Sequence, residues 1–153
     1  MKKKINFKVL IACLIIVFLV AFIGSVFTSG NTDSEWYQSV KSKLTPPNLV
    51  FPIVWSILFF LIALSLYFAW IQNKQRKKLA FAFGLNFILN ILWSFLFFQL
   101  KNPLYAFMEL IILWISIVYM IFITGKIDKK SAWLLVPYLL WVSFASILNF
   151  LAI

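Results

Sequence analysis

Hydrophobic residues fill five long stretches of the chain, and short polar segments separate them. The stretches cover residues 9–27, 49–71, 79–100, 103–124 and 132–153, and Glu109 is the single charged residue inside them. An α-helix of about 20 residues crosses a hydrocarbon core of about 30 Å, and a backbone in lipid must form its hydrogen bonds within its own segment. The pattern predicts an all-α membrane protein, a five-transmembrane-helix bundle that forms one domain over residues 1–153.

Composition supports this interpretation. Apolar residues make up 64% of the chain and charged residues 12%, whereas soluble domains are about half apolar and a quarter charged. The sequence has no His and only one Cys, which excludes a His-ligated metal or haem and an intramolecular disulfide. We therefore predict no metal site, no catalytic residues and no bound cofactor.

Basic residues predict the topology of the bundle. The N-terminal tail contains Lys2, Lys3, Lys4 and Lys8, and further basic residues cluster in segments 72–78 and 125–131. Because basic loops stay on the cytoplasmic side, we expect a cytoplasmic N-terminus and an outer C-terminus, with a bacterial plasma membrane as the location. The net charge of +10 is then explained by contact with membrane lipid headgroups, and we predict no nucleic-acid partner.

The connections differ in length. Those after the second, third and fourth stretches are short, so we expect sequential helices to pack as antiparallel neighbours. The outer loop over residues 28–48 is long, contains Trp36 and Tyr37, and ends at Pro46 and Pro47. We favour a lid over the bundle, and the alternative is an aromatic anchor in the membrane interface.

Polar residues in the third stretch share one helical face. Their spacing matches the repeat of an α-helix and places five residues on one side of it, namely Asn86, Asn90, Trp93, Ser94 and Phe97. Since amides in hydrocarbon need partners, this face should point into the bundle. The alternatives are hydrogen bonds between helices and a polar contribution to a ligand site.

Two further helices carry similar stripes. These are Phe51, Trp55 and Phe59 in the second stretch, and Trp141, Ala145 and Asn149 in the fifth. Aromatic stripes often pack as core, but Trp combined with Asn and a small Ala favours a pocket for a flat apolar ligand that has a few polar atoms.

Other residues inside the stretches have less common chemistry. Glu109 is expected to face the interior, either at a ligand site or as a structural carboxyl group. Pro52 and Pro137 are expected to kink their helices and free a carbonyl group. Ala80 and Gly84 form a small-xxx-small pair, which predicts a homodimer.

These residues resemble the tryptophan-rich sensory protein (TspO) family, which is related to the translocator protein or peripheral benzodiazepine receptor. Four ordered blocks between Trp36 and Asn149 carry the resemblance. They are Trp36-Tyr37 followed by Pro46-Pro47-x-x-Val50-Phe51-Pro52-x-Val54-Trp55, then Asn86-x-x-x-Asn90-x-x-Trp93-Ser94, then Pro103 to Glu109, and finally Pro137-Tyr138-x-x-Trp141-x-x-x-Ala145-x-x-x-Asn149.

The resemblance implies a five-helix membrane protein, often dimeric, that binds porphyrin-type tetrapyrroles and isoquinoline- or benzodiazepine-like molecules in a pocket beneath the first long loop. Carried over by motif, the ligand-binding residues would be Trp36, Tyr37, Pro47, Trp55, Phe59, Asn90, Trp93, Glu109, Trp141 and Ala145. The chain departs from the family pattern at Ser42 and Leu44, where a Pro and an aromatic residue are usual, and at Phe59, which often matches a Tyr. The last stretch has no Lys or Arg, so cholesterol transport is not carried over.

We therefore expect a tetrapyrrole-binding membrane receptor or sensor. One alternative is an enzyme that degrades porphyrin with light or oxygen, although the sequence has no nucleophile–base pair to support catalysis. The other is a small-molecule transporter, for which no inverted repeat is evident.

Overall fold

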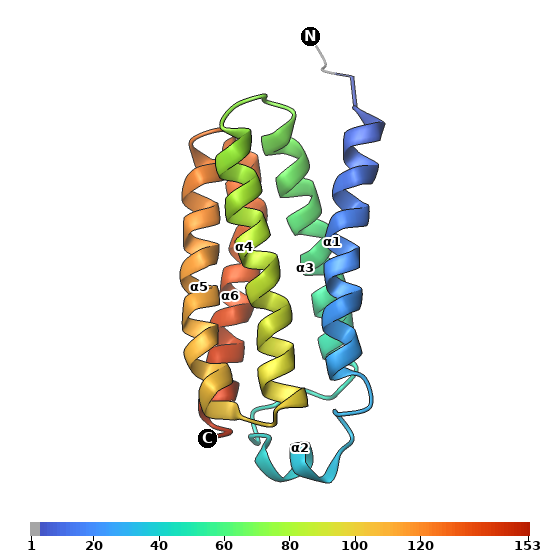
Figure 1. Ribbon diagram of the computed structural model, residues 1–153, viewed down its shortest axis with the longest axis vertical. Helices are drawn as coiled ribbons and strands as arrows, with labels where there is room; N and C mark the ends of the chain where they lie inside the picture. The colour runs from blue at the N-terminus through green and yellow to red at the C-terminus, as the bar shows by residue number, and fades with distance from the viewer. Residues whose placement is uncertain (1–3) are drawn as a thin grey trace.

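The computed structural model describes residues 4–153 and contains one bundle of helices with no strand in that range (Figure 1). Within these residues, five helices are long and apolar enough to cross a membrane, which confirms the predicted fold class. Lys2 and Lys3 of the basic tail lie outside the described residues. The elements are α1 (Phe7–Thr28), α2 (Glu35–Val40), α3 (Val50–Trp70), α4 (Arg76–Ser94), η1 (Phe95–Gln99), α5 (Pro103–Gly125) and α6 (Lys129–Phe150).

The long helices form a ring in which α1 packs against both α3 and α4, α3 packs against α6, and α6 and α4 both pack against α5. The prediction that sequential helices are neighbours is confirmed for α4 with α5 and for α5 with α6. It is wrong for α3 and α4, which contact each other little, whereas α1 packs against both of them. The long loop between α1 and α3 gives α1 the freedom to take this position.

Side-chain caps explain where several helices begin. Asn6 accepts a hydrogen bond from the backbone N–H of Val9 at 3.3 Å, and Asp128 accepts one from that of Ser131 at 2.9 Å. Asn102 caps α5 in the same way, and Pro103 follows it at the first helical position, where its missing N–H costs nothing.

The two prolines in the apolar stretches have different effects. Pro52 lies in the first turn of α3, where the missing N–H removes no helical hydrogen bond, so the freed carbonyl expected there does not arise. Pro137 lies inside α6, and it removes the donor that the carbonyl of Trp133 would otherwise use.

The last turn of the third spanning helix widens into a π-helix, η1. Leu100 donates its N–H to the carbonyl of Phe95 at 2.9 Å, which is the i→i+5 pattern of a π-helix. Nothing in the sequence pattern predicted this change. Its consequence is local, because η1 directs Phe97 and Phe98 into the end of the bundle, where both are buried.

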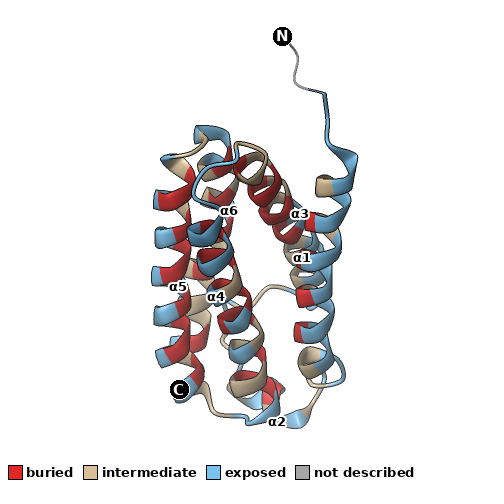
Figure 2. Cartoon of the chain, turned by 45° about the horizontal axis from the view of Figure 1, so that its top comes forward, coloured by how far each residue is buried: buried red, intermediate tan, exposed pale blue. Residues whose placement is uncertain are grey.

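Outward-facing side chains are largely apolar, and the buried residues face the centre of the ring (Figure 2). Lys4, Lys8 and the α3–α4 and α5–α6 connections lie at one end of the bundle. The helix α2, the α4–α5 connection and the C-terminus lie at the opposite end. The basic residues thus concentrate at one end of an apolar cylinder, as expected of an integral membrane protein.

Candidate ligand-binding site

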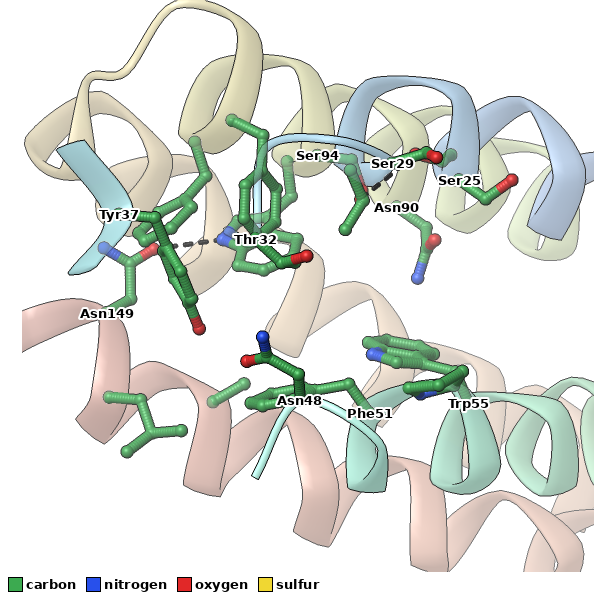
Figure 3. Close-up of a pocket in the computed structure, with 18 of the residues that line it drawn as sticks. Ser25, Ser29, Thr32, Tyr37, Asn48, Phe51, Trp55, Asn90, Ser94 and Asn149 are labelled. Carbon is green, nitrogen blue, oxygen red and sulfur yellow. Dashed lines mark hydrogen bonds between the residues drawn. The ribbon is translucent and has the colours of Figure 1, made fainter. Parts of the chain in front are cut away.

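A cavity of about 440 Å³ lies beneath α2 and the long loop, at the end of the bundle that carries the C-terminus (Figure 3). Its volume is within the range typical of small-molecule sites. Every long helix except α5 contributes to its lining. The lining residues are Ala21, Gly24, Ser25, Thr28, Ser29, Thr32, Tyr37, Lys41, Thr45, Asn48, Phe51, Pro52, Trp55, Phe59, Asn90, Trp93, Ser94, Phe97, Phe98, Ala145, Leu148, Asn149 and Ala152.

Two aromatic pairs from different helices dominate the apolar part of this cavity. On α3, the rings of Trp55 and Phe59 lie 5.4 Å apart with an interplanar angle of 30°. Across the cavity, Trp93 stacks on Phe97 at 5.4 Å and 21°. Indole rings on two sides of a hollow provide flat faces suited to a planar ligand.

Hydrogen bonds fix one of these indoles in place. Trp93 donates its Nε1–H to Asn149 Oδ1 at 3.0 Å (Figure 3). Asn149 in turn donates to the backbone carbonyl of Pro103 at 2.8 Å. The chain of contacts joins α4, α6 and α5. The orientation of Trp93 is therefore set by the bundle and does not depend on a ligand.

A second network ties the amides of α4 to the neighbouring helices. Asn90 donates to the hydroxyl of Tyr138 at 3.1 Å, and this hydroxyl donates to Asn86 Oδ1 at 3.1 Å. Asn86 in turn donates to Ser116 Oγ at 2.8 Å. For Asn86, which is completely buried, hydrogen bonding between helices is confirmed as the role of the amide. Asn90 combines that role with a place in the cavity wall.

The long loop covers the cavity and packs on η1. Tyr37 is only 6% exposed, and its ring lies 5.6 Å from that of Phe98 and 6.3 Å from that of Phe97. The ring of Trp36 also packs on that of Phe97, with centroids 5.6 Å apart. Burial raises the pKa of the Tyr37 phenol above its ordinary value. Of the two interpretations of this loop, the lid is the one that the geometry supports.

The hydroxyl groups at the rim of the cavity were not predicted from the sequence. Hydroxyl groups of Ser25, Thr28, Ser29, Thr32 and Thr45 lie there, together with Asn48 and Lys41. The available signal was the recurrence of small or polar residues at 21, 24, 25 and 28, which form one face at the end of α1. On that face, a Cβ atom at Gly24 would lie 3.7 Å from Ser94 Oγ, so α1 and α4 approach closely.

Six of the ten predicted site residues line the cavity. They are Tyr37, Trp55, Phe59, Asn90, Trp93 and Ala145. The structure places Trp36, Pro47 and Trp141 elsewhere. Trp36 packs on the ring of Phe97, Pro47 is exposed on the loop beside the lining residue Asn48, and Trp141 packs against the ring of Phe51 at 5.8 Å.

Glu109 also lies outside the lining. It belongs to α5, is 5% exposed, and neither carboxylate oxygen has a hydrogen-bond partner among the residues that the structure describes. The expectation that it faces the interior is confirmed, but α5 contributes nothing to the cavity wall. Over residues 4–153, no group of three or more His, Cys, Asp or Glu side chains is placed to hold a metal ion.

Comparison with known proteins places this arrangement in a family. Residues 12–152 match the family model described as the TspO/MBR family. The chain is 41% identical over 151 residues to the tryptophan-rich protein TspO of Archaeoglobus fulgidus, with 95% of both chains covered. It is 37% identical over 144 residues to the protein of the same name from Chlorobaculum tepidum, covering 90% of this chain and 89% of the relative. The tryptophan-rich sensory protein of Cereibacter sphaeroides is 31% identical over 117 residues, with 76% and 73% covered.

Proposed function

Since this chain belongs to the TspO/MBR family of membrane proteins, we propose that it is a sensory receptor whose ligand is a porphyrin-type tetrapyrrole held in the cavity beneath α2. The observation that carries the proposal is the placement of Trp55 and Trp93 on different helices around one hollow of about 440 Å³. A planar macrocycle between these indoles would exclude water from their aromatic faces.

The rim supports the same ligand class. Hydroxyl groups and Lys41 line the same cavity as the two aromatic pairs, and Thr32 and Asn48 lie nearer the loop than Trp55 does (Figure 3). A porphyrin has an apolar ring and acidic side chains, so its propionates would meet Lys41 and the hydroxyl groups while the ring stacks below. Isoquinoline- or benzodiazepine-like molecules would occupy the aromatic part alone.

The proposal is tested by titrating the purified protein with protoporphyrin in the dark and following the Soret band and the quenching of tryptophan fluorescence. Trp55→Ala removes one cavity face and should weaken binding by about tenfold, which corresponds to about 1.4 kcal/mol. Trp133→Ala is the matched control, because Trp133 is 73% exposed on the outside of α6. Equal affinities for the two variants would contradict the proposed site.

We also propose that the N-terminus is cytoplasmic and the C-terminus is outside, in a bacterial plasma membrane. The concentration of Lys and Arg at the N-terminal end of the bundle supports this orientation. In a Cys13→Ala background, an impermeant maleimide added to intact cells should label Lys43→Cys and spare Lys78→Cys. The reverse labelling pattern would contradict the orientation.

We also propose that the chain forms a homodimer. Ala80 is exposed on α4, and a Cβ atom built on Gly84 would meet no atom within 4 Å, so this small-residue pair faces outward and is open to a second copy. Gly84→Leu should shift the chain from dimer to monomer in cross-linking experiments, with Leu85→Ala as the control. A dimer that persists in Gly84→Leu would contradict this interface.

A further inference from the structure

A second hollow lies on the outside of the bundle, where α3 and α6 meet. It has a volume of about 490 Å³ and is open to the outside of the bundle. We call it the α3–α6 groove. Its lining is entirely apolar or aromatic and shares no residue with the cavity. The lining residues are Val54, Ile57, Leu58, Pro137, Leu140, Trp141 and Phe144.

A single aromatic layer separates this groove from the cavity. Phe51 lines the cavity and Trp141 lines the groove, and their rings meet edge to face with centroids 5.8 Å apart. On α3, neighbouring residues line different hollows, since Val54 lines the groove and Trp55 lines the cavity. On α6, Trp141 and Ala145 are one turn apart on the same stripe, with the first in the groove and the second in the cavity.

The indole N–H of Trp141 differs from those of Trp93 and Trp114 in its contacts. Trp93 and Trp114 both donate their N–H groups, to Asn149 and to Ser143. The N–H of Trp141 is buried and finds no acceptor in the described part of the chain. A buried donor without a partner costs about 1–3 kcal/mol, so hydrogen bonding does not hold this ring against Phe51. Pro137, one turn earlier, also leaves α6 with one helical hydrogen bond fewer.

We propose that the α3–α6 groove is the docking and entry site for flat, apolar molecules dissolved in the bilayer, which reach the cavity when Phe51 and Trp141 rotate apart. The inference rests on the proposed function, because it needs a cavity that binds such a ligand. Its occupant follows from position and chemistry. The groove lies between membrane-spanning helices, is lined without polar side chains, and is one ring away from a cavity with aromatic walls.

The test separates binding rates from affinity. Leu140 lines the groove and is 65% exposed, so Leu140→Trp fills the groove without touching the cavity. Ile147→Trp is the matched control, since Ile147 is 54% exposed on the same helix and lines neither hollow. Protoporphyrin is delivered from phosphatidylcholine vesicles to the protein in proteoliposomes, and stopped-flow fluorescence gives the association and dissociation rates.

Leu140→Trp should slow association and dissociation together by about tenfold, as an added barrier of about 1.4 kcal/mol would do, while the dissociation constant stays within about twofold. Ile147→Trp should leave both rates unchanged. Trp141→Ala should have the opposite effect on the rates. It removes the ring that blocks the route, so association and dissociation should both become faster. Trp133→Ala is its control and should leave both rates unchanged.

The two proposals fail in distinguishable ways. Rates in Leu140→Trp and Trp141→Ala equal to those of their controls, with normal affinity, would overturn the entry route and leave the receptor proposal standing. A groove that retains lipid in every variant, with no effect on the rates, would likewise overturn the entry route alone. Absence of protoporphyrin binding by the wild-type protein would overturn both proposals.

Discussion

Trp93 and Asn149 are joined by a hydrogen bond of 3.0 Å between two helices that lie far apart in the sequence, and both side chains line the cavity. The bond makes one wall of the cavity a fixed part of the fold. Asn149 also contacts the start of α5 through the carbonyl of Pro103. A site built in this way is organised before a ligand arrives, which reduces the ordering cost of binding.

The buried amide of Asn86 is expected to stabilise the bundle. Asn86→Leu removes the hydrogen bonds to Tyr138 and Ser116, so each of these hydroxyl groups loses one of its partners in the interior of the bundle. We expect a loss of about 1–2 kcal/mol in the free energy of unfolding, because two contacts are lost and each contributes about 0.6 kcal/mol on average in a membrane protein. Reversible unfolding in mixed micelles measures it. Ser143→Ala, at the exposed contact with Trp114, is the control and should cost less.

Phe97 is expected to hold the lid closed. Its ring contacts Trp36 and Tyr37 of α2, and a buried Phe→Ala change typically costs about 3–5 kcal/mol. In Phe97→Ala, trypsin should therefore cleave more rapidly after Lys41 and Lys43, the two basic residues that follow α2. The control is Leu100→Ala, which changes a residue that is 52% exposed. Identical cleavage rates in the two variants would show that the aromatic contacts do not restrain the loop.

Glu109 is expected to tolerate loss of its charge. A buried carboxyl group without hydrogen-bond partners opposes folding, and an amide of the same shape removes the acidic group without leaving a void. Glu109→Gln should therefore fold with equal or greater thermal stability and bind protoporphyrin with unchanged affinity, since α5 does not line the cavity. Glu35→Gln on exposed α2 is the control. A Glu109→Gln protein that folds but has lost affinity would place this carboxyl group at the ligand.

The pH dependence of the lid follows from Tyr37. Burial raises the pKa of its phenol, so the folded protein favours the neutral form. The stability that Tyr37 contributes is complete below its unfolded pKa of about 10, and it is lost as the pH rises through the raised folded value. Spectrophotometric titration of tyrosinate in the wild type and in Tyr37→Phe isolates this group as the difference. The titration component that Tyr37→Phe lacks should have its midpoint above about pH 10. A midpoint at or below that value would contradict the assignment to a buried phenol.

The parts of the fold that follow from repeated local pattern could be predicted from the sequence. Continuous apolar stretches defined the five long helices, and the spacing of Asn90 and Trp93 identified the inner face of α4. The ring order could not be predicted, because it depends on which faces of α1 and α3 pack together. The π-helix at Phe95–Gln99 was equally out of reach, since its sequence is as apolar as that of the α-helix before it.

The site residues show the same division. Trp55 and Ala145 lie on stripes that converge on the cavity, as expected. Trp141 lies on the same stripe as Ala145 but one turn earlier in α6. At that level the stripe lines the α3–α6 groove and no longer lines the cavity. Periodicity identifies a face of a helix, and only the packing of the neighbouring helix decides where along that face the cavity ends.

The most direct test of the receptor proposal fills the cavity from within. Ala145 is a small residue of the wall, and Ala145→Trp would place an indole in the space proposed for the ligand, while Ile147→Trp adds the same group outside. Equilibrium titration with protoporphyrin should show affinity reduced by at least about tenfold in Ala145→Trp and unchanged in Ile147→Trp. Equal affinities in two variants that unfold at the same temperature would show that the ligand does not occupy this cavity.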